Sequence, residues 1–231
     1  METALETIRQ LAESKTEVTL LNTYKGIPFS HPAQFVEKVS KIATLVTHPH
    51  QLICIHYLRN VFIMADSLPQ PILAHALDLQ IARRRVLLHD FEFASPNFGK
   101  RASVRAVPRD RTFTQVLNLS REGKEWRGEI QDISIGGAGL KFPTLDPEAF
   151  AEGDCVQMDF SLPDMQATPQ EYHLIGQIRY LADFPMQGFW RMGIQTAPEG
   201  EMLQKLEQYV EHRRAEVLAE FDAFEPEKKL Q

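Results

Sequence analysis

The sequence predicts an all-β protein made of two small β-barrel domains, with a short helix at its start and a long helix at its end. Short strand-like runs separated by Gly, Pro and Asn turns occupy most of the chain. A stretch of turn-forming residues at 94–99 divides these runs into two groups. Near both ends of the chain, apolar residues recur at helical spacing instead. We therefore expect one domain over residues 1–95 and a second over residues 96–231.

The first domain is predicted to begin with an amphipathic helix and to continue as strands. Leu5, Ile8 and Leu11 share one face of a helix over residues 3–12. The strands are expected at 18–21, 27–29, 34–39, 42–46, 52–57, 61–64, 72–80 and 85–93. Strands of this length, joined by tight turns, are typical of a small barrel or sandwich, and we expect a split-barrel-like domain.

The second domain is predicted to be a six-stranded antiparallel barrel, because closure removes exposed strand edges. Its strands are expected at 112–118, 125–131, 139–142, 155–161, 172–180 and 189–195. Asp146 and Pro147 are suited to cap and start a short helical turn over 146–150. A long helix follows, whose apolar stripe is interrupted by Arg213 and Arg214 and is formed by Leu203, Leu206, Val210, Val217, Leu218 and Phe221. We expect it to pack on the barrel; the alternative is that its end, beyond His212, supports an oligomer or docks a partner.

The charge balance favours one discrete anion site over general binding to nucleic acid polymers. The chain has 231 residues, an ordinary hydrophobic content of 43% and a formal net charge of −6. Between Gly99 and Arg111, however, the sequence holds five basic residues and one acidic residue. One basic segment on an acidic protein indicates a local site for an anion.

Cysteine usage and the N-terminus predict a cytoplasmic protein that does not insert into the membrane. Cys54 and Cys155 lie on strand-like segments in different predicted domains, which argues against a disulfide framework. The start of the chain carries Glu2 and Glu6 and lacks the apolar run of a signal peptide. No apolar run reaches the length of a membrane-spanning helix.

His48, His50 and His56 lie close together in the sequence and suggest a metal site, but their surroundings argue against one. His48 and His50 flank a proline in an expected turn, without a Cys, Asp or Glu at ligand spacing. Cys54 and His56 would share one strand face in an apolar run that resembles core. Because a structural metal site normally needs a fuller ligand set, no metal or cofactor is expected.

The candidate site combines an arginine pair with an Asp–Ser–Gly turn. Arg101 and Arg105 are four positions apart, and a hairpin of strands 112–118 and 125–131 follows them. Such a hairpin would return the turn to the neighbourhood of the arginines. That turn is formed by Asp132, Ser134, Gly136, Gly137 and Gly139.

These residue types suit an anionic ligand that carries guanine. Arginine offers a planar fork of donors for phosphate oxygens or for O6 and N7 of guanine, and its flat face stacks on a base. Asp132 supplies acceptors for the N–H groups of guanine, and Ser134 adds a small donor and acceptor. Gly136, Gly137 and Gly139 can take positive φ and let a ligand approach the backbone closely.

The spacing Arg-x-x-x-Arg followed by Asp-x-Ser-x-x-Gly resembles the signature of PilZ domains, bacterial receptors for cyclic di-GMP. Residues 153–163 resemble the middle strand of that family, and residues 191–195 resemble its closing strand. The resemblance implies cyclic di-GMP binding by Arg101, Arg105, Asp132, Ser134, Gly136 and Gly137, with Lys100, Arg109 and Arg111 as secondary contacts. The strand order of the first domain resembles the N-terminal domain of YcgR-type flagellar-brake proteins, which implies a protein partner such as a flagellar motor component.

The sequence gives no reason to expect an enzyme. A Gly-x-Ser-x-Gly elbow, a Walker loop and a metal-protease helix motif are all missing from it. Two alternatives to a receptor remain open. One is a PilZ-fold module that only binds proteins and has lost nucleotide binding. The other is an enzyme that acts on a guanine nucleotide.

Overall fold

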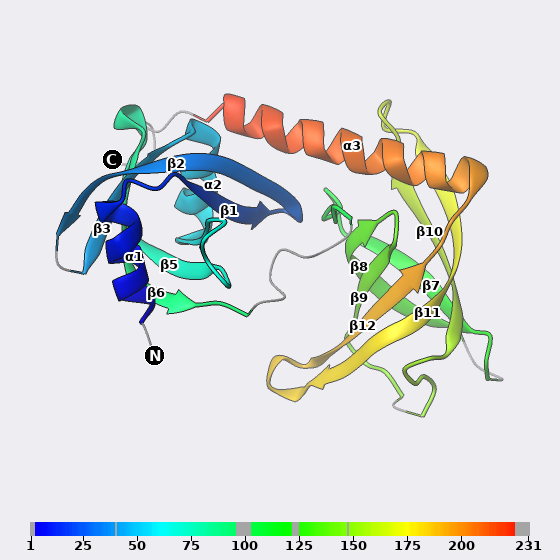
Figure 1. The fold of residues 1–231 in the computed structure, drawn as a ribbon. Helices are drawn as coiled ribbons and strands as arrows, with labels where there is room; N and C mark the ends of the chain where they lie inside the picture. The colour runs from blue at the N-terminus through cyan, green and yellow to red at the C-terminus, as the bar shows by residue number, and fades with distance from the viewer. Residues whose placement is uncertain (1–2, 40, 96–102, 122–124, 147, 225–231) are drawn as a thin grey trace. The chain divides into compact units, whose positions relative to one another are not determined.

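The computed structural model describes residues 3–39, 41–95, 103–121, 125–146 and 148–224 of the chain. These residues fall into two compact units, one within Met1–Ala102 together with Leu218–Gln231 and the other within Ser103–Val217. Each unit is built on one closed six-stranded antiparallel barrel (Figure 1). The predicted all-β class with two barrels is therefore confirmed. The domain boundary expected at residue 95 stays a prediction, since 96–102 lie outside the described residues.

The first barrel has the strand order β1-β2-β3-β6-β5-β4 and is closed by the pairing of β1 with β4. Its elements are α1 (Ala4–Glu13), β1 (Val18–Tyr24), β2 (Ile27–Val39), β3 (Ile42–Thr47), α2 (Pro49–Leu58), β4 (Asn60–Met64), β5 (Ile72–Gln80), the short 3-10 helix η1 (Ile81–Arg83) and β6 (Arg85–Phe93). The two strands predicted at 27–29 and 34–39 are one continuous strand, β2. Alternate residues of the strands, such as Leu20, Leu45, Ile63 and Leu88, fill the core.

The strand predicted at 52–57 is wrong, because these residues belong to helix α2. The run from Leu52 to Ile55 is buried on every side, so its apolar pattern fits a buried strand and a buried helix equally well. The expected turn at His48 is the N-cap of the helix, with Pro49 at its first position. Cys54 therefore lies in a buried helix, where burial raises the pKa of its thiol.

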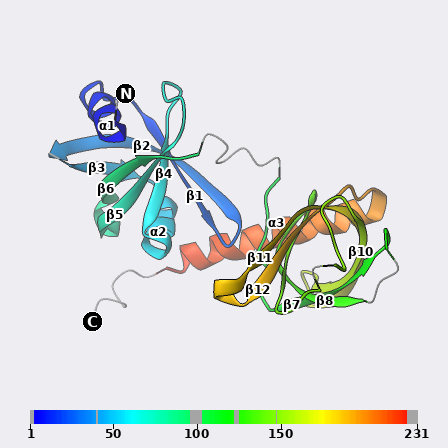
Figure 2. The same cartoon turned by 90° about the horizontal axis from the view of Figure 1, so that it is seen from below.

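The second barrel has the order β10-β11-β12-β9-β8-β7, closed by the pairing of β10 with β7. Its elements are β7 (Thr112–Asn118), β8 (Trp126–Ser134), β9 (Gly137–Phe142), β10 (Cys155–Pro163), β11 (Pro169–Phe184), the 3-10 helix η2 (Pro185–Gln187), β12 (Phe189–Thr196) and helix α3 (Gly200–Asp222). Figure 2 shows the ring of strands nearly end-on. Near the short helical turn expected at 146–150, the Asp146 carboxylate accepts from the N–H of Glu148, and its carbonyl accepts from the N–H of Ala149.

Helix α3 contributes its residues up to Val217 to the second unit, and the residues from Leu218 belong to the first. Within the first unit, Phe221 packs on Phe29, with ring centroids 4.7 Å apart. Within the second unit, Leu206, Val210 and Val217 are buried. The predicted long C-terminal helix with an apolar stripe is confirmed. Over the described ranges, no helix combines the length and the apolar character needed to cross a bilayer.

Candidate functional site

Residues 103–111, which carry Arg105 and which we call the arginine segment, are held against strand β8 by two backbone hydrogen bonds. Ala106 and Ile133 form an isolated antiparallel bridge, in which each backbone N–H donates to the other residue's carbonyl, at 2.8 and 2.9 Å. Both residues are fully buried. In this antiparallel bridge Arg105 and Asp132 lie one residue away on opposite sides of the bridged pair, a separation that the long Arg105 side chain spans.

Arg105 and Asp132 form an ion pair in the described structure. The Nη1 atom of Arg105 donates to Oδ1 of Asp132 at 3.0 Å. The two side chains keep 36% and 23% of their exposure, so solvent and ligands can reach both. An ion pair this exposed contributes no more than about 1 kcal/mol. The ion pair therefore holds the guanidinium and the carboxylate in place, and a ligand that separates them loses little binding free energy.

The Asp132 carboxylate lies directly over Gly139, its partner in the β8–β9 register. A Cβ atom added to Gly139 would come within 2.8 Å of Oδ2 of Asp132. The absence of a side chain at Gly139 is therefore what allows this carboxylate to occupy its position. Sequence reasoning had given Gly139 only a general freedom of conformation.

Ser134 uses its hydroxyl to build the turn between β8 and β9. Its Oγ donates to the carbonyl of Gly137 at 3.2 Å and accepts from the N–H of Gly136 at 3.3 Å. The side chain is almost completely buried. The structure thus gives the Ser134 hydroxyl two backbone partners within the turn.

The two glycines of this turn are constrained in different ways. Gly137 has a φ of 149°, and an added Cβ would lie 2.0 Å from the carbonyl oxygen of Ile194. No side chain fits there without moving β12. Gly136 is exposed, and its nearest neighbour would be Oγ of Ser103 at 3.6 Å, which is ordinary contact. Ser103, two residues before Arg105, therefore brings the arginine segment to the open side of the turn.

Arg109 and Arg111, the other described basic residues of the arginine segment, pair with carboxylates outside the Asp132–Gly137 turn. Arg109 has its Nη1 3.6 Å from Oε1 of Glu216 on α3 and is 72% exposed. Arg111 donates two hydrogen bonds to Glu129, at 2.9 and 3.2 Å, and these hold the pKa of the Glu129 carboxyl below its ordinary value. The predicted contacts Lys100 and Arg101 lie outside the described residues.

Sequence reasoning missed one residue that positions the arginine segment. Arg213 of α3 is only 4% exposed, and its Nε donates to the carbonyl of Val107 at 3.2 Å. Its Nη1 pairs with Glu216. The signal was present in the sequence, since an arginine within the apolar stripe of a helix needs a buried partner. Helix α3 thus fixes the chain two residues beyond Arg105.

The chain is similar along most of its length to several proteins of known structure. MrkH from K. pneumonia, in complex with c-di-GMP, is 12% identical with a TM-score of 0.47, covering 94% of this chain and 95% of that one. The inhibitor of motility MotI/DgrA from Bacillus subtilis is 13% identical with a TM-score of 0.43, covering 94% and 99%. YcgR from Escherichia coli, also in complex with c-di-GMP, is 14% identical with a TM-score of 0.42, covering 95% and 93%. With TM-scores below 0.5, these likenesses do not assign a ligand to this chain.

Comparison of the sequence with protein families gives a firmer result. None of the curated proteins compared with the chain matches it. Residues 100–212 match the family model described as the PilZ domain. That range holds the arginine segment, the Asp132–Gly137 turn and all six strands of the second barrel. The second unit therefore matches the PilZ domain, over slightly less than half of the length of the chain.

Proposed function

We propose that the protein is a non-catalytic receptor for cyclic di-GMP, bound between the arginine segment and the Asp132–Gly137 turn. The observation that carries the proposal is the exposed Arg105–Asp132 pair, held beside a glycine turn by the buried Ala106–Ile133 bridge. A fork of donors and an acidic acceptor thus lie at one place in a PilZ domain. Phosphate oxygens and the N–H groups of guanine are the complementary partners.

Each site residue has a distinct role in this proposal. Arg101 and Arg105 contact phosphate oxygens and the edges or faces of guanine. Asp132 accepts hydrogen bonds from guanine, and Gly136 offers an open backbone to the ligand. Ser134 and Gly137 act through the shape of the turn, because the Ser134 hydroxyl already has two backbone partners. Lys100 and Arg109 remain secondary contacts.

Ligand binding then exchanges one ion pair for several stronger contacts. Arg105 and Asp132 neutralise each other in the described structure, so neither charge is left uncompensated before binding. A ligand separates them at a cost of no more than about 1 kcal/mol. Charge-assisted hydrogen bonds to phosphate and guanine return roughly 1.5–3 kcal/mol each. The balance favours binding of a ligand that satisfies both side chains at once.

We extend the proposal to signalling through the arrangement of the two domains. Arg101 follows the predicted linker by only a few residues, so a ligand bound to it can shift the equilibrium between arrangements of the two domains. The changed arrangement is read by a protein partner in the bacterial cytoplasm. A flagellar motor component is the first candidate, because the first domain resembles that of YcgR-type proteins. Labels in each domain should report this change by fluorescence transfer, and Arg105→Ala should suppress it.

The deciding experiment is calorimetric titration of the purified protein with cyclic di-GMP. Arg105→Ala should weaken binding about ten- to a hundred-fold, since it removes at least one charge-assisted contact. Arg109→Ala is the comparison variant, because Arg109 is only a secondary contact and pairs with Glu216, so its loss should weaken binding less. Equal binding by the parent and Arg105→Ala would place the ligand elsewhere.

Asp132→Ala separates base recognition from phosphate recognition. The carboxylate suits the donors of guanine, whereas adenine presents a different edge. Titration of the parent and the variant with cyclic di-GMP and cyclic di-AMP should show a smaller preference for guanine in the variant. An unchanged preference would assign selectivity to the arginines.

One observation also favours a second candidate function, a protein-interaction module that does not bind nucleotide. In the described structure Arg105 and Asp132 satisfy each other, which is also what a PilZ-fold module without a nucleotide would need. Absence of binding across a panel of cyclic dinucleotides would favour that protein-interaction module. Breakdown of cyclic di-GMP during incubation would instead indicate an enzyme.

A further inference from the structure

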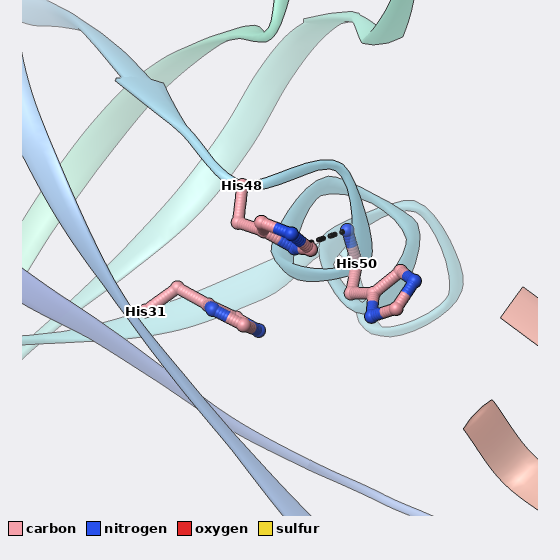
Figure 3. Close-up of side chains that lie close together, drawn as sticks. All are labelled: His31, His48 and His50. Atoms are coloured by element: carbon pink, nitrogen blue, oxygen red, sulfur yellow. Dashed lines mark hydrogen bonds between the residues drawn. The ribbon is translucent and has the colours of Figure 1, made fainter. Parts of the chain in front are cut away.

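Three imidazole rings converge in the first unit at the start of α2. His31 comes from β2, His48 is the N-cap residue of α2, and His50 lies in its first turn. One ring nitrogen of each histidine lies within 4.8 Å of those of the other two. Figure 3 shows the three rings close together, reaching one space from two separate stretches of chain.

The barrel itself brings these two stretches together. Ala33 pairs with Thr47 in the β2–β3 register, and the Thr47 hydroxyl donates to the carbonyl of Pro32 at 2.9 Å. Thr47 is buried and Pro32 is exposed, so this bond is partly shielded from water. It fixes the residue after His31 beside the residue before His48.

We propose that His31, His48 and His50 form a binding site for a divalent transition-metal ion of the zinc class. Imidazole nitrogen is a preferred ligand for such ions, and three histidines with one solvent position make a complete tetrahedral set. His31 and His50 are half-buried and His48 is exposed, so an ion can enter from solvent.

The rings need to turn only modestly to bind an ion. His31 and His48 are stacked, with centroids 4.3 Å apart, and His48 meets His50 edge to face at 4.8 Å. With ligand bonds of about 2.0–2.1 Å, the nitrogens of a tetrahedral site lie roughly 3.3 Å apart. The present separations of up to 4.8 Å must therefore shrink, and rotation of the side chains at fixed backbone supplies that movement.

The hydrogen bonds around the cluster select the ligand nitrogen of His50. Its Nε2 lies 2.9 Å from Oδ1 of Asp222, so Nε2 carries the proton and Nδ1 keeps the lone pair. A carboxylate on the outer nitrogen is the partner that commonly orients a metal-binding histidine and raises its basicity. Asp222 is the last residue of α3 and belongs to the same unit.

His31 and His48 differ in which ring nitrogens are free to bind the ion. Among the described residues, the His31 ring makes no hydrogen bond, so either of its nitrogens can bind the ion. Nδ1 of His48 accepts from the N–H of His50 at 3.2 Å, a long bond that caps α2. A metal ion on His48 replaces this cap, and its bond to His50 in the same turn compensates for the loss. Burial lowers the pKa of His31 and His48, and the neighbouring imidazoles lower both further.

This site would tie the end of α3 to the first barrel. Phe221, the neighbour of Asp222, contacts the ring of His50 with centroids 5.8 Å apart. An ion on His50 stiffens the ring that both residues contact. His56, which the sequence grouped with His48 and His50, lies instead among the rings of Tyr57 and Phe224.

The test is titration of the untagged full chain with Co²⁺, followed by competition with Zn²⁺. We expect one equivalent of Co²⁺ with the visible absorption of a tetrahedral nitrogen site, displaced by Zn²⁺. His31→Gln should abolish this signal, and Asp222→Asn should weaken binding about 10- to 100-fold. His75→Gln is the matched control, since the His75 ring lies beside His89 on the same barrel and is not one of the three converging histidines.

The outcomes separate clearly. Stoichiometric binding that His31→Gln removes and His75→Gln retains would establish the site. Failure of the parent to bind Co²⁺, or equal binding by His31→Gln, would overturn it. Circular dichroism checks that each variant folds. The melting temperature of the parent provides a reading that needs no variant, because an ion that binds only the folded protein must raise it. Cyclic di-GMP binding is not involved in any of these readings.

Discussion

The arginine site of the second unit and the histidine cluster of the first are built in opposite ways. In the second unit, Asp132, Ser134, Gly136 and Gly137 follow one another within a single β-hairpin, and Arg105 reaches them through one bridge. In the first unit, His31 is separated from His48 by most of two strands, and Asp222 comes from the far end of the chain. Most of the arginine site is a local sequence pattern, whereas the histidine cluster exists only after the first barrel has closed.

This difference determines how each region holds its geometry. The arginine site depends on glycines whose missing side chains make room for a carbonyl and a carboxylate. The histidine cluster depends on side-chain hydrogen bonds, from Thr47 to Pro32 and from His50 to Asp222. Steric exclusion is abrupt, whereas a lost hydrogen bond is graded. Substitutions in the arginine site should therefore lower stability or affinity more than substitutions in the histidine cluster.

The largest effect should come from Gly137→Ala. The new methyl group would lie 2.0 Å from the carbonyl oxygen of Ile194, in a backbone conformation that suits only glycine. We expect a loss of about 3 kcal/mol or more in the free energy of unfolding. Denaturation in urea measures it, and Gly136→Ala is the control, because its methyl group meets nothing closer than 3.6 Å. Equal stability of the two variants would remove the steric argument.

Gly139→Ala should damage the site more than the fold. Its methyl group would meet the Asp132 carboxylate, at 2.8 Å, which can swing aside because it ends a flexible side chain. Stability should fall by less than about 1 kcal/mol, while displacement of the carboxylate weakens cyclic di-GMP binding about tenfold. Denaturation and calorimetry on the same sample compare the two losses. A variant with intact affinity would show that Asp132 does not contact the ligand.

Thr47→Val tests whether the two regions are independent. It keeps the shape of the side chain but removes the hydroxyl that donates to Pro32, which should cost about 1–2 kcal/mol of stability. With this restraint gone, His31 is held less firmly beside His48, and Co²⁺ affinity should fall. Cyclic di-GMP affinity should not change. A loss of both Co²⁺ and cyclic di-GMP affinity would contradict the independence of the two regions.

The same contrast explains what the sequence could predict. The strands of the second barrel and the approach of Arg105 to Asp132 follow from period-2 patterns and short turns, which are local properties. Helix α2 was mistaken for a strand, because a run buried on all sides carries no periodic signal. His31 was not grouped with His48, since only the β2–β3 register joins them. Arg213 was seen as an interruption of its helix, because its partner Val107 is remote in sequence.

The smallest effect concerns a charge pair on the second barrel, outside the Asp132 turn. Arg111 lowers the pKa of Glu129 mainly through its hydrogen bond, with a further contribution from its charge. A carboxyl whose folded-state pKa is depressed adds stability above its unfolded pKa, and this contribution disappears as the pH falls through the folded value. Arg111→Gln should therefore raise the pKa of Glu129, and its stability deficit against the parent should vanish in acid.

Carbon-detected NMR titration of the Glu129 carboxyl measures this shift directly. Arg127→Gln is the control, because Arg127 lies over the ring of Phe113, 4.3 Å from its centroid, as Arg111 also does at 5.5 Å. That variant removes a charge from the same face without removing the hydrogen bond to Glu129. Arg111→Gln should also leave cyclic di-GMP affinity unchanged, since its guanidinium is committed to Glu129. A loss of affinity would extend the ligand site along β8 and add Arg111 to its contacts.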